Sequence, residues 1–294
     1  MSVAGSTESV HLHPYSQIIG AEEKSLVDYT ESDHEAVHAA VKAQLTAWKD
    51  NKVATDYVAY GCQNFGDEQN SFKWDLVPFS ENKPFRFWNW RVFQQLGLLF
   101  RISFGSRVKA AKGAPKCAKP VERKDKRKSA FCKAEIIKKQ RVFEGDTCQV
   151  LYDYRPIGLG KKKLHMLVLP KEQRVGYEDM TDDEAAEFYR LSQGVAKYMG
   201  EKQGAKKVHL FYKKGYRAGQ QVPHIFCSIV GNDTTKADWW SKITMLVRIS
   251  GLFKRPIPQK QLEEAVKLHS SGLRSSLAAP GNNSPDAKAE VNGE

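Results

Sequence analysis

The stretch from Thr181 to Val230 constrains the fold of this chain more than any other. It opens with Thr-Asp-Asp-Glu, a capping box, and apolar residues then recur at helical spacing: Phe188, Leu191, Val195, Tyr198 and Met199. Two strand-like runs follow, at 207–213 and 223–230. A capped amphipathic helix followed at once by two strands predicts a unit that mixes helix and sheet.

Two further strand-like runs precede this helix, at 146–154 and 164–169, joined by a loop that contains Pro and Gly. The second run ends at Pro170-Lys171. The resulting order β, β, α, β, β predicts an α+β fold, with a mainly antiparallel sheet and one long helix across it.

Residues 32–105 predict a smaller α+β domain of unknown type. A capping box at 32–35 precedes an apolar helical stripe, and strands are expected within 53–65 and 71–79. The most hydrophobic run, 85–105, is interrupted by Arg, Asn and Gln, so it is no transmembrane helix. Core packing and binding to a membrane or a partner both remain open for this run.

The remaining segments are expected to lack a core of their own. Residues 1–31 are polar and predict a flexible arm, and 256–294 predict a helix followed by a disordered tail from Ser270. Residues 106–128 form a linker with ten basic and two acidic residues, in a chain of net charge +12. This linker either attracts nucleic acid, an anionic membrane or a phosphorylated ligand, or is a solvated spacer.

The cysteines and the N-terminus indicate a cytoplasmic protein. The five cysteines are scattered, odd in number and free of any C-x-x-C pair, as expected of reduced thiols. The first residues show no basic segment followed by an apolar one, so no secretory signal is predicted.

The second unit, 129–255, resembles the histidine triad (HIT) superfamily of nucleotide hydrolases and transferases. The resemblance rests on three pieces in the family's order: SAFCKAEIIKKQRVFEGDTCQVLYDYRPI, LHMLVLPKEQ and VHLFYKKGYRAGQQVPHIFCSIVG, with the capped helix before the third. It implies a HIT-like antiparallel sheet with one long helix. Since family members often form dimers, it also implies that a homodimer is one option for this protein.

In the family pattern, three histidines lie on one face of the last strand, and the middle one attacks the phosphorus of a nucleotide. The corresponding places here hold His224, Phe226 and Ser228. Attack on phosphorus needs a lone-pair nitrogen, which phenylalanine does not have. His224 and Ser228 are therefore the remnant of a catalytic triad that has lost its nucleophile.

The resemblance still implies a ligand-binding site. The Gly219-Gln220 pair and the Lys213-Lys214 turn are kept, so backbone N–H groups and lysine charge could hold a phosphate. The residues that the resemblance assigns to ligand binding are Asp153, His165, Lys213, Gly219, Gln220 and His224.

Some family members bind a structural zinc ion, at places that here hold Ser129, Cys132, His165 and His224. Tetrahedral zinc prefers four nitrogen or sulfur ligands, and serine is a poor one. A closed site is therefore not expected, although zinc held by Cys132, His165 and His224 with a further cysteine or a water remains an alternative.

The sequence thus predicts a HIT-like protein that binds a nucleotide or another phosphorylated ligand, with weak or no hydrolase activity. One alternative is an active hydrolase or transferase with a different nucleophile, for which Cys227, His165 and Ser228 are candidates. The other is an interaction module that uses the basic linker and the aromatic run to bind membrane, nucleic acid or protein.

Overall fold

A computed structural model describes residues 17–20, 23–51, 56–65, 71–79, 129–157, 162–215, 218, 220–232 and 256–278. The expected basic linker (106–128) and the hydrophobic run 85–105 lie outside these residues. No helix within the described ranges is long and apolar enough to cross a membrane.

The described residues form one eight-stranded sheet, in which every pairing is antiparallel. Its order is β1-β3-β2-β7-β8-β6-β5-β4. The strands are β1 (Gln17–Ile19), β2 (Asp56–Asn64), β3 (Trp74–Phe79), β4 (Arg141–Glu144), β5 (Cys148–Tyr152), β6 (His165–Pro170), β7 (Lys207–Lys214) and β8 (Cys227–Asn232). The expected α+β class and antiparallel sheet are confirmed.

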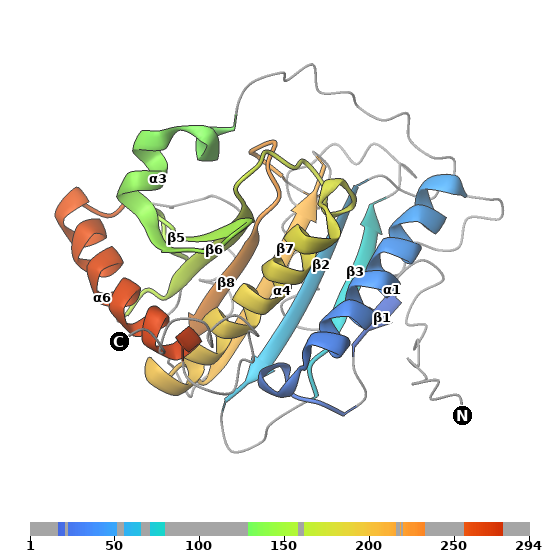
Figure 1. Ribbon diagram of the computed structural model, residues 1–294, viewed down its shortest axis with the longest axis horizontal. Helices are drawn as coiled ribbons and strands as arrows, with labels where there is room; N and C mark the ends of the chain where they lie inside the picture. Colours follow the sequence, from blue (N-terminus) through green and yellow to red (C-terminus); the bar gives the residue numbers. More distant parts are fainter. Residues whose placement is uncertain are drawn as a thin grey trace, which may run out of the picture.

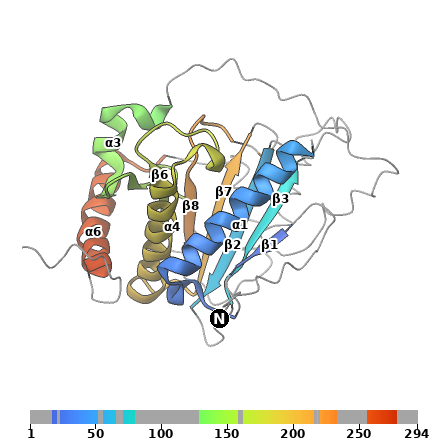
Figure 2. The same cartoon turned by 45° about the vertical axis from the view of Figure 1, so that its right-hand side comes forward.

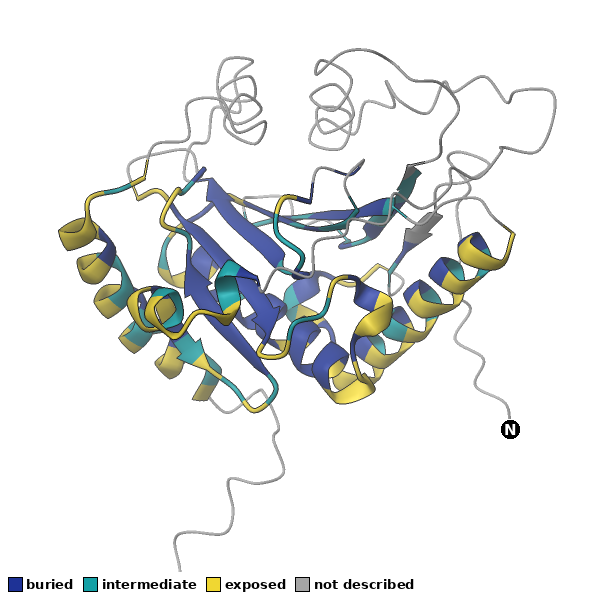
Figure 3. Ribbon diagram, turned by 90° about the horizontal axis from the view of Figure 1, so that it is seen from above, coloured by how far each residue is buried: buried dark blue, intermediate teal, exposed yellow. Residues whose placement is uncertain are grey.

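Three long helices cover one face of the sheet (Figures 1 and 2). They are α1 (Glu31–Asp50), α4 (Asp182–Lys197) and α6 (Gln259–Ala278). A single turn of π-helix, Tyr198–Lys202, prolongs α4, and short 3-10 turns occupy Leu26–Asp28, Ala130–Cys132 and Tyr177–Asp179. Seen from above, the strands are mostly buried, while the helices expose their outer sides (Figure 3).

The capping box expected for α4 is present. The Thr181 side chain accepts a hydrogen bond from the Glu184 amide, and the Glu184 carboxylate accepts one from the Thr181 amide. The capping box of helix α1 lies two residues earlier than the sequence predicts, because Thr30, not Ser32, is the N-cap and Asp33 completes the box. Its expected apolar stripe is buried against α4 and the sheet.

The N-terminal unit is not a separate domain, which corrects the expected division at residue 105. Strand β2 pairs along its whole length with β7, so residues from both units share one sheet. Their side chains also share one core cluster, which runs from Ile19 to Leu273. Because β2 pairs with β7, the sheet and the main core cluster both continue from the N-terminal unit into the second unit.

Four other expectations about element boundaries need correction. Within the expected flexible arm, Ile19, Leu26 and Tyr29 are buried in the core. Within the expected disordered tail, residues 270–278 are helical as the end of α6. A short helix, α3 (Ala134–Gln140), was not predicted, and β8 begins at Cys227 rather than at residue 223.

Candidate functional site

His224, the first of the triad positions, is a fully buried residue just before β8. Its Nε2 donates a hydrogen bond to the carbonyl oxygen of Pro170, at 2.9 Å, and its Nδ1 has no hydrogen-bond partner in the described part of the chain. Burial lowers the pKa of His224 below its ordinary value, and the hydrogen bond to Pro170 only partly offsets this. The ring therefore stays neutral and fastens the segment before β8 to the end of β6.

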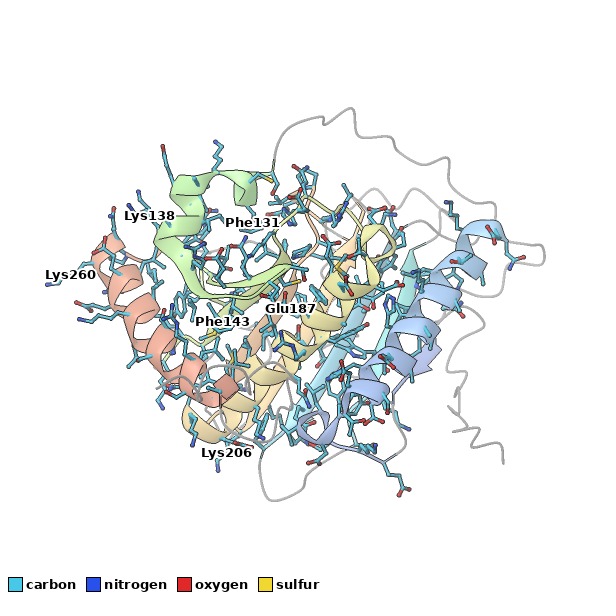
Figure 4. The ribbon with its side chains drawn as sticks, in the orientation of Figure 1. Phe131, Lys138, Phe143, Glu187, Lys206 and Lys260 are labelled. Carbon is cyan, nitrogen blue, oxygen red and sulfur yellow. The ribbon has the colours of Figure 1, made fainter. Side chains whose placement is uncertain are left out.

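Phe226, at the second triad position, lies in an apolar cluster. Phe131 meets it edge to face, with ring centroids 5.5 Å apart, and also meets His224 at 6.0 Å. Phe131 lies just before α3 (Figure 4). The other members of the cluster are Leu151, Leu167, Leu169 and Ile137. The position that the family pattern gives to a nucleophile is thus part of a hydrophobic contact.

Ser228, at the third triad position, is buried in the middle of the sheet, where it pairs with Leu167 on β6 and Phe211 on β7. Side chains paired in this way point to the same face. We call this face, opposite α1, α4 and α6, the triad face; Tyr60, Phe211, Ser228 and Leu167 form one row across it. Residues on the other face, such as Met166 and Leu210, join the core under the helices.

The turn expected to hold a phosphate is closed by Gln220. Its side-chain oxygen accepts a hydrogen bond from the Gly215 amide at 2.9 Å, and its nitrogen donates one to the Val175 carbonyl at 2.8 Å. Both polar atoms of the Gln220 side chain are therefore used in hydrogen bonds that hold the turn. Gly215 adopts a φ of 91°, a backbone conformation that favours glycine. Gly219 lies outside the described residues.

The two lysines of this turn have different surroundings. Lys214 pairs with Glu178, whose other carboxylate oxygen accepts a hydrogen bond from Tyr57. Lys213 is half-buried and pairs with Val58 of β2. Because Lys213 lies two residues beyond Phe211, it belongs to the triad face. Of the two, Lys213 is the one placed to meet a ligand there.

Asp153 and His165, both expected to bind a ligand, contact each other directly. Asp153 follows β5 and His165 begins β6, and the Asp153 amide donates to the His165 carbonyl at 3.1 Å. A carboxylate oxygen of Asp153 lies 3.0 Å from Nδ1 of His165. The Arg155 amide donates to the other carboxylate oxygen at 2.9 Å. The backbone at the ends of β5 and β6 and the turn at Arg155 therefore hold the Asp153 and His165 side chains in contact.

The hydrogen bonds of His165 determine which of its nitrogens is available. The Ile157 amide approaches Nδ1 at 3.4 Å, farther than the carboxylate. We place the proton on Nδ1, because the carboxylate can only accept and its contact is the shorter one. Nε2 is buried, and no described residue forms a hydrogen bond with it. His165 therefore presents a nitrogen, oriented by a carboxylate, without a partner of its own.

This pair belongs to the triad face. His165 pairs with Val230 of β8 and shares its side of β6 with Leu167. Two strands further on, His209 of β7 pairs with Cys62 of β2 on the same face. Sequence reasoning missed these two residues, since nothing local indicates that β2 pairs with β7.

The four family zinc positions do not form a metal site. The Cys132 thiol donates to the Gln173 side chain at 3.4 Å, while Ser129 accepts from the Phe131 amide. His165 contacts Asp153 at the start of β6, and His224 bonds Pro170 at its other end. Among the described side chains, no group of three or more His, Cys, Asp or Glu could hold a metal ion. These residues do not fit a tetrahedral zinc ion.

Comparison with known proteins identifies the same part of the chain. The family model for the HIT domain matches residues 134–235. No curated protein matches by sequence.

Several solved structures share the fold at low sequence identity. A mutant uridylyltransferase is 15% identical to this chain. The match covers 88% of this chain and 78% of the uridylyltransferase chain, with a TM-score of 0.51. An ADP-glucose phosphorylase from Arabidopsis thaliana, with bound ADP-glucose, is 10% identical, with 86% and 72% covered and a TM-score of 0.50. A GalT-like protein from the same plant is 11% identical, with 87% and 75% covered and a TM-score of 0.51.

The shared fold extends beyond the family match, because these structures cover 86–88% of the chain, which is far more than residues 134–235. The match itself contains β4 to β8, α4, the Asp153–His165 pair and the three triad positions. The protein therefore carries a HIT domain at residues 134–235, within a fold that it shares with these solved structures.

Proposed function

We propose that this protein binds a nucleotide or another phosphorylated ligand on its triad face, and that it hydrolyses this ligand weakly or not at all. Two findings favour a nucleotide. The chain carries a HIT domain, and one structure of the same fold, the ADP-glucose phosphorylase, holds a sugar nucleotide. The phosphorylase is 10% identical to this chain, so it supports a class of ligand, the nucleotides, and no particular nucleotide.

The observation that carries the proposal is the contact between Asp153 and His165, with Nε2 of His165 left without a hydrogen-bond partner among the described residues. A buried polar atom without a hydrogen bond is costly, by about 1–3 kcal/mol, and a ligand atom at this place would remove that cost. The carboxylate of Asp153 stabilises a positive charge on the ring. A protonated Nε2 would then donate to a phosphate oxygen.

Weak turnover follows from the state of the triad positions. Phe226 is packed against Phe131 and has no nitrogen with which to attack phosphorus. His224, the remaining triad histidine, uses its Nε2 to bond Pro170 and is held neutral by burial. Neither residue can act as nucleophile without breaking contacts that hold β8 in place.

A second candidate function is turnover with His165 as the nucleophile. The same geometry favours it, because a carboxylate at Nδ1 leaves the lone pair of Nε2 free to attack. In such a reaction Nε2 would form a P–N bond to the nucleotide phosphorus while the P–O bond to the rest of the substrate breaks and that part leaves; water or a second substrate would then take the nucleotidyl group from His165. The two candidates differ in one observable, a covalent mass increase on the protein.

Thermal unfolding with a panel of mononucleotides, dinucleoside polyphosphates and sugar nucleotides tests both candidates. At 100 times its Kd a ligand adds about 2.7 kcal/mol, which raises the Tm by about 5–10 °C for a chain of this size. We expect this shift for the wild type and its loss in His165→Gln and Asp153→Asn. His38→Gln is the matched control, since His38 lies on α1 on the helix side of the sheet.

Two results would contradict the proposal. One is that no member of the panel binds the wild type by calorimetry. The other is that His165→Gln binds as tightly as His38→Gln. A nucleotide-dependent mass increase on His165, seen by mass spectrometry of the intact protein and its peptides, would favour the second candidate.

Three further expectations stay predictions. The binding of nucleic acid or an anionic membrane rests on residues 106–128, which lie outside the described ranges. A homodimer and a cytoplasmic location rest on the sequence alone.

A further inference from the structure

Tyr60, Cys62 and His209 form a cluster on the triad face, where β2 meets β7. Cys62 and His209 are direct partners in the antiparallel register, so their side chains point to the same face. The Tyr60 hydroxyl lies 2.8 Å from Nδ1 of His209, and the two rings stack with centroids 6.1 Å apart. A nucleophile, a base and a group that orients the base are thus in contact.

The charged neighbours of Cys62 favour its thiolate. Burial raises the pKa of the Cys62 thiol, but the charge of His209, hydrogen bonds from His209 and Tyr60, and the charge of Lys207 bring it below its ordinary value. On β3, Asp75 pairs with Tyr60. The charged groups that favour the Cys62 thiolate are therefore His209 and Lys207, both on β7.

The other described cysteines have different environments. Cys148 and Cys227 are fully buried, and burial raises the pKa of each thiol to about 12. Cys132 is exposed, but its thiol donates a hydrogen bond to Gln173, which favours the protonated form. Cys62 is half-buried and lies beside a histidine. A reactive cysteine needs both partial access and an adjacent cation, and Cys62 has both.

We propose that Cys62 is a peroxide-reactive thiolate, activated by His209, which Tyr60 holds in position. The sulfur attacks one oxygen of a hydroperoxide, so that an S–O bond forms and the O–O bond breaks. With hydrogen peroxide, the leaving hydroxide takes the proton of the His209 imidazolium and departs as water. The sulfur is oxidised by two electrons to a sulfenic acid, the peroxide is reduced, and His209 becomes neutral.

The oxidation changes the charge at the junction of β2 and β7. The thiolate is negatively charged and the sulfenic acid is neutral, so the oxidation removes a negative charge from beside His209 and Lys207. Because β2 belongs to the N-terminal half and β7 to the HIT domain, the change acts where the two halves of the chain are joined. One molecule of a small thiol converts the sulfenic acid to a mixed disulfide with release of water, and a second molecule then displaces Cys62 as a free thiol and leaves as the small disulfide.

Dimedone labelling tests the proposal on the intact, reduced protein. Dimedone adds only to sulfenic acids, and peptide mass spectrometry then locates the label. We expect hydrogen peroxide to produce the label on Cys62 several-fold faster than on Cys132, with none on Cys148 or Cys227. Equal labelling of Cys62 and Cys132, or labelling of Cys132 alone, would overturn the proposal.

Two variants separate activation by His209 from simple exposure of the thiol. In His209→Gln, the rate of alkylation of Cys62 by iodoacetamide should reach its plateau at a higher pH than in the wild type. Tyr60→Phe keeps the aromatic ring and removes the hydroxyl, so it should shift the profile in the same direction by less. Profiles that coincide with the wild type in both variants would refute the role of His209.

Unfolding of a variant would show itself in the same experiment. Cys148 and Cys227 react only when the core opens, so their modification identifies an unfolded sample. If His209→Gln unfolds, the alkylation profile of Tyr60→Phe tests the proposal instead, since the phenylalanine ring still fills the space of the tyrosine ring. An unchanged Cys62 profile in a folded Tyr60→Phe protein then counts against the proposal.

Discussion

The carboxylate of Glu187 fastens the turn between β4 and β5 to α4, and its removal should strongly destabilise the protein. Glu187 lies on α4 and its side chain is only 7% exposed (Figure 4). It accepts hydrogen bonds from the amides of Asp146, Thr147 and Cys148, at 3.1, 2.6 and 2.7 Å, and from the Thr147 hydroxyl at 2.8 Å. Arg190 donates to the same carboxylate at 2.8 Å.

The substitution Glu187→Gln keeps the shape and removes the charge. One carboxylate oxygen accepts three of the turn's hydrogen bonds, and the amide oxygen of glutamine can take its place. The amide nitrogen must then face the Asp146 amide and Arg190, which are both donors. Hydrogen bonds to a charged group contribute about 1.5–3 kcal/mol each, so we expect a loss of about 3 kcal/mol. The half-exposed Arg190 adds little to this.

Thermal and urea unfolding measure this loss. For a domain of this size, about 3 kcal/mol lowers the Tm by about 6–12 °C. Glu201→Gln is the control, because it makes the same chemical change at an exposed position. It should alter the Tm by less than about 2 °C.

The dependence on pH provides an independent check. Burial raises the pKa of Glu187, but the hydrogen bonds from Thr147, Cys148 and Asp146 lower it below its ordinary value. The carboxylate therefore stabilises the protein above about pH 4, its unfolded value, and this contribution is lost as the pH falls through the folded pKa. A Tm difference at pH 7 no larger than that of the control would refute this reasoning. So would a difference that does not narrow below about pH 4.

Two further predictions concern the core and the triad positions. Burial and then the charge of Lys162 lower the pKa of His269 to about 4, so His269 must gain its proton at cost as the pH falls from about 6.5. The wild-type Tm should therefore fall between pH 6.5 and 4 more steeply than that of His269→Gln, and parallel curves in a pH series would contradict this. Phe226→His should not create a hydrolase, because His224 stays bonded to Pro170, and it should lower stability by about 1–3 kcal/mol through lost packing on Phe131. A nucleotidyl group on residue 226, detected by mass spectrometry, would contradict it.

Local signals in the sequence account for the elements that were predicted correctly. The capping box at Thr181 and Glu184 begins α4 where expected, because both of its hydrogen bonds form within four residues. Strands β5 and β6 lie in short, mainly apolar runs bounded by turn residues, which a single chain segment can show. The resemblance then placed these elements in order, and the family match agrees with it.

The start of β8 could not be read from its own residues. The stretch from Pro223 alternates like a strand, yet β8 begins only at Cys227. The Ile225 amide bonds the Arg174 carbonyl, and the His224 side chain bonds Pro170. These partners lie about 50 residues away in sequence, so tertiary contacts decide where the strand begins.

The candidate site was predicted residue by residue but not as an arrangement. Asp153 and His165 were both expected to bind a ligand, and the structure adds that one orients the other. Gln220 was expected to help hold a phosphate, and the structure shows its side chain bonded to Gly215 and Val175 instead. A resemblance to a family indicates which residue stands at each position of the site. The hydrogen bonds that its side chain forms depend on the neighbouring atoms in this protein.

The pairing of β2 with β7 explains why the N-terminal half was not recognised and why it matters. Without β2, β7 would be an edge strand with a row of unpaired backbone groups, and edges of this kind favour aggregation. The helices of the two halves also contact each other. The His34 ring of α1 stacks on the Tyr189 ring of α4, and its Nε2 forms a hydrogen bond with the Gln193 side chain. The HIT domain is therefore completed by the rest of the chain. Cys62 and His209 exist as a pair only because of that completion, so a chemical change at Cys62 would act on the contact that the whole sheet requires.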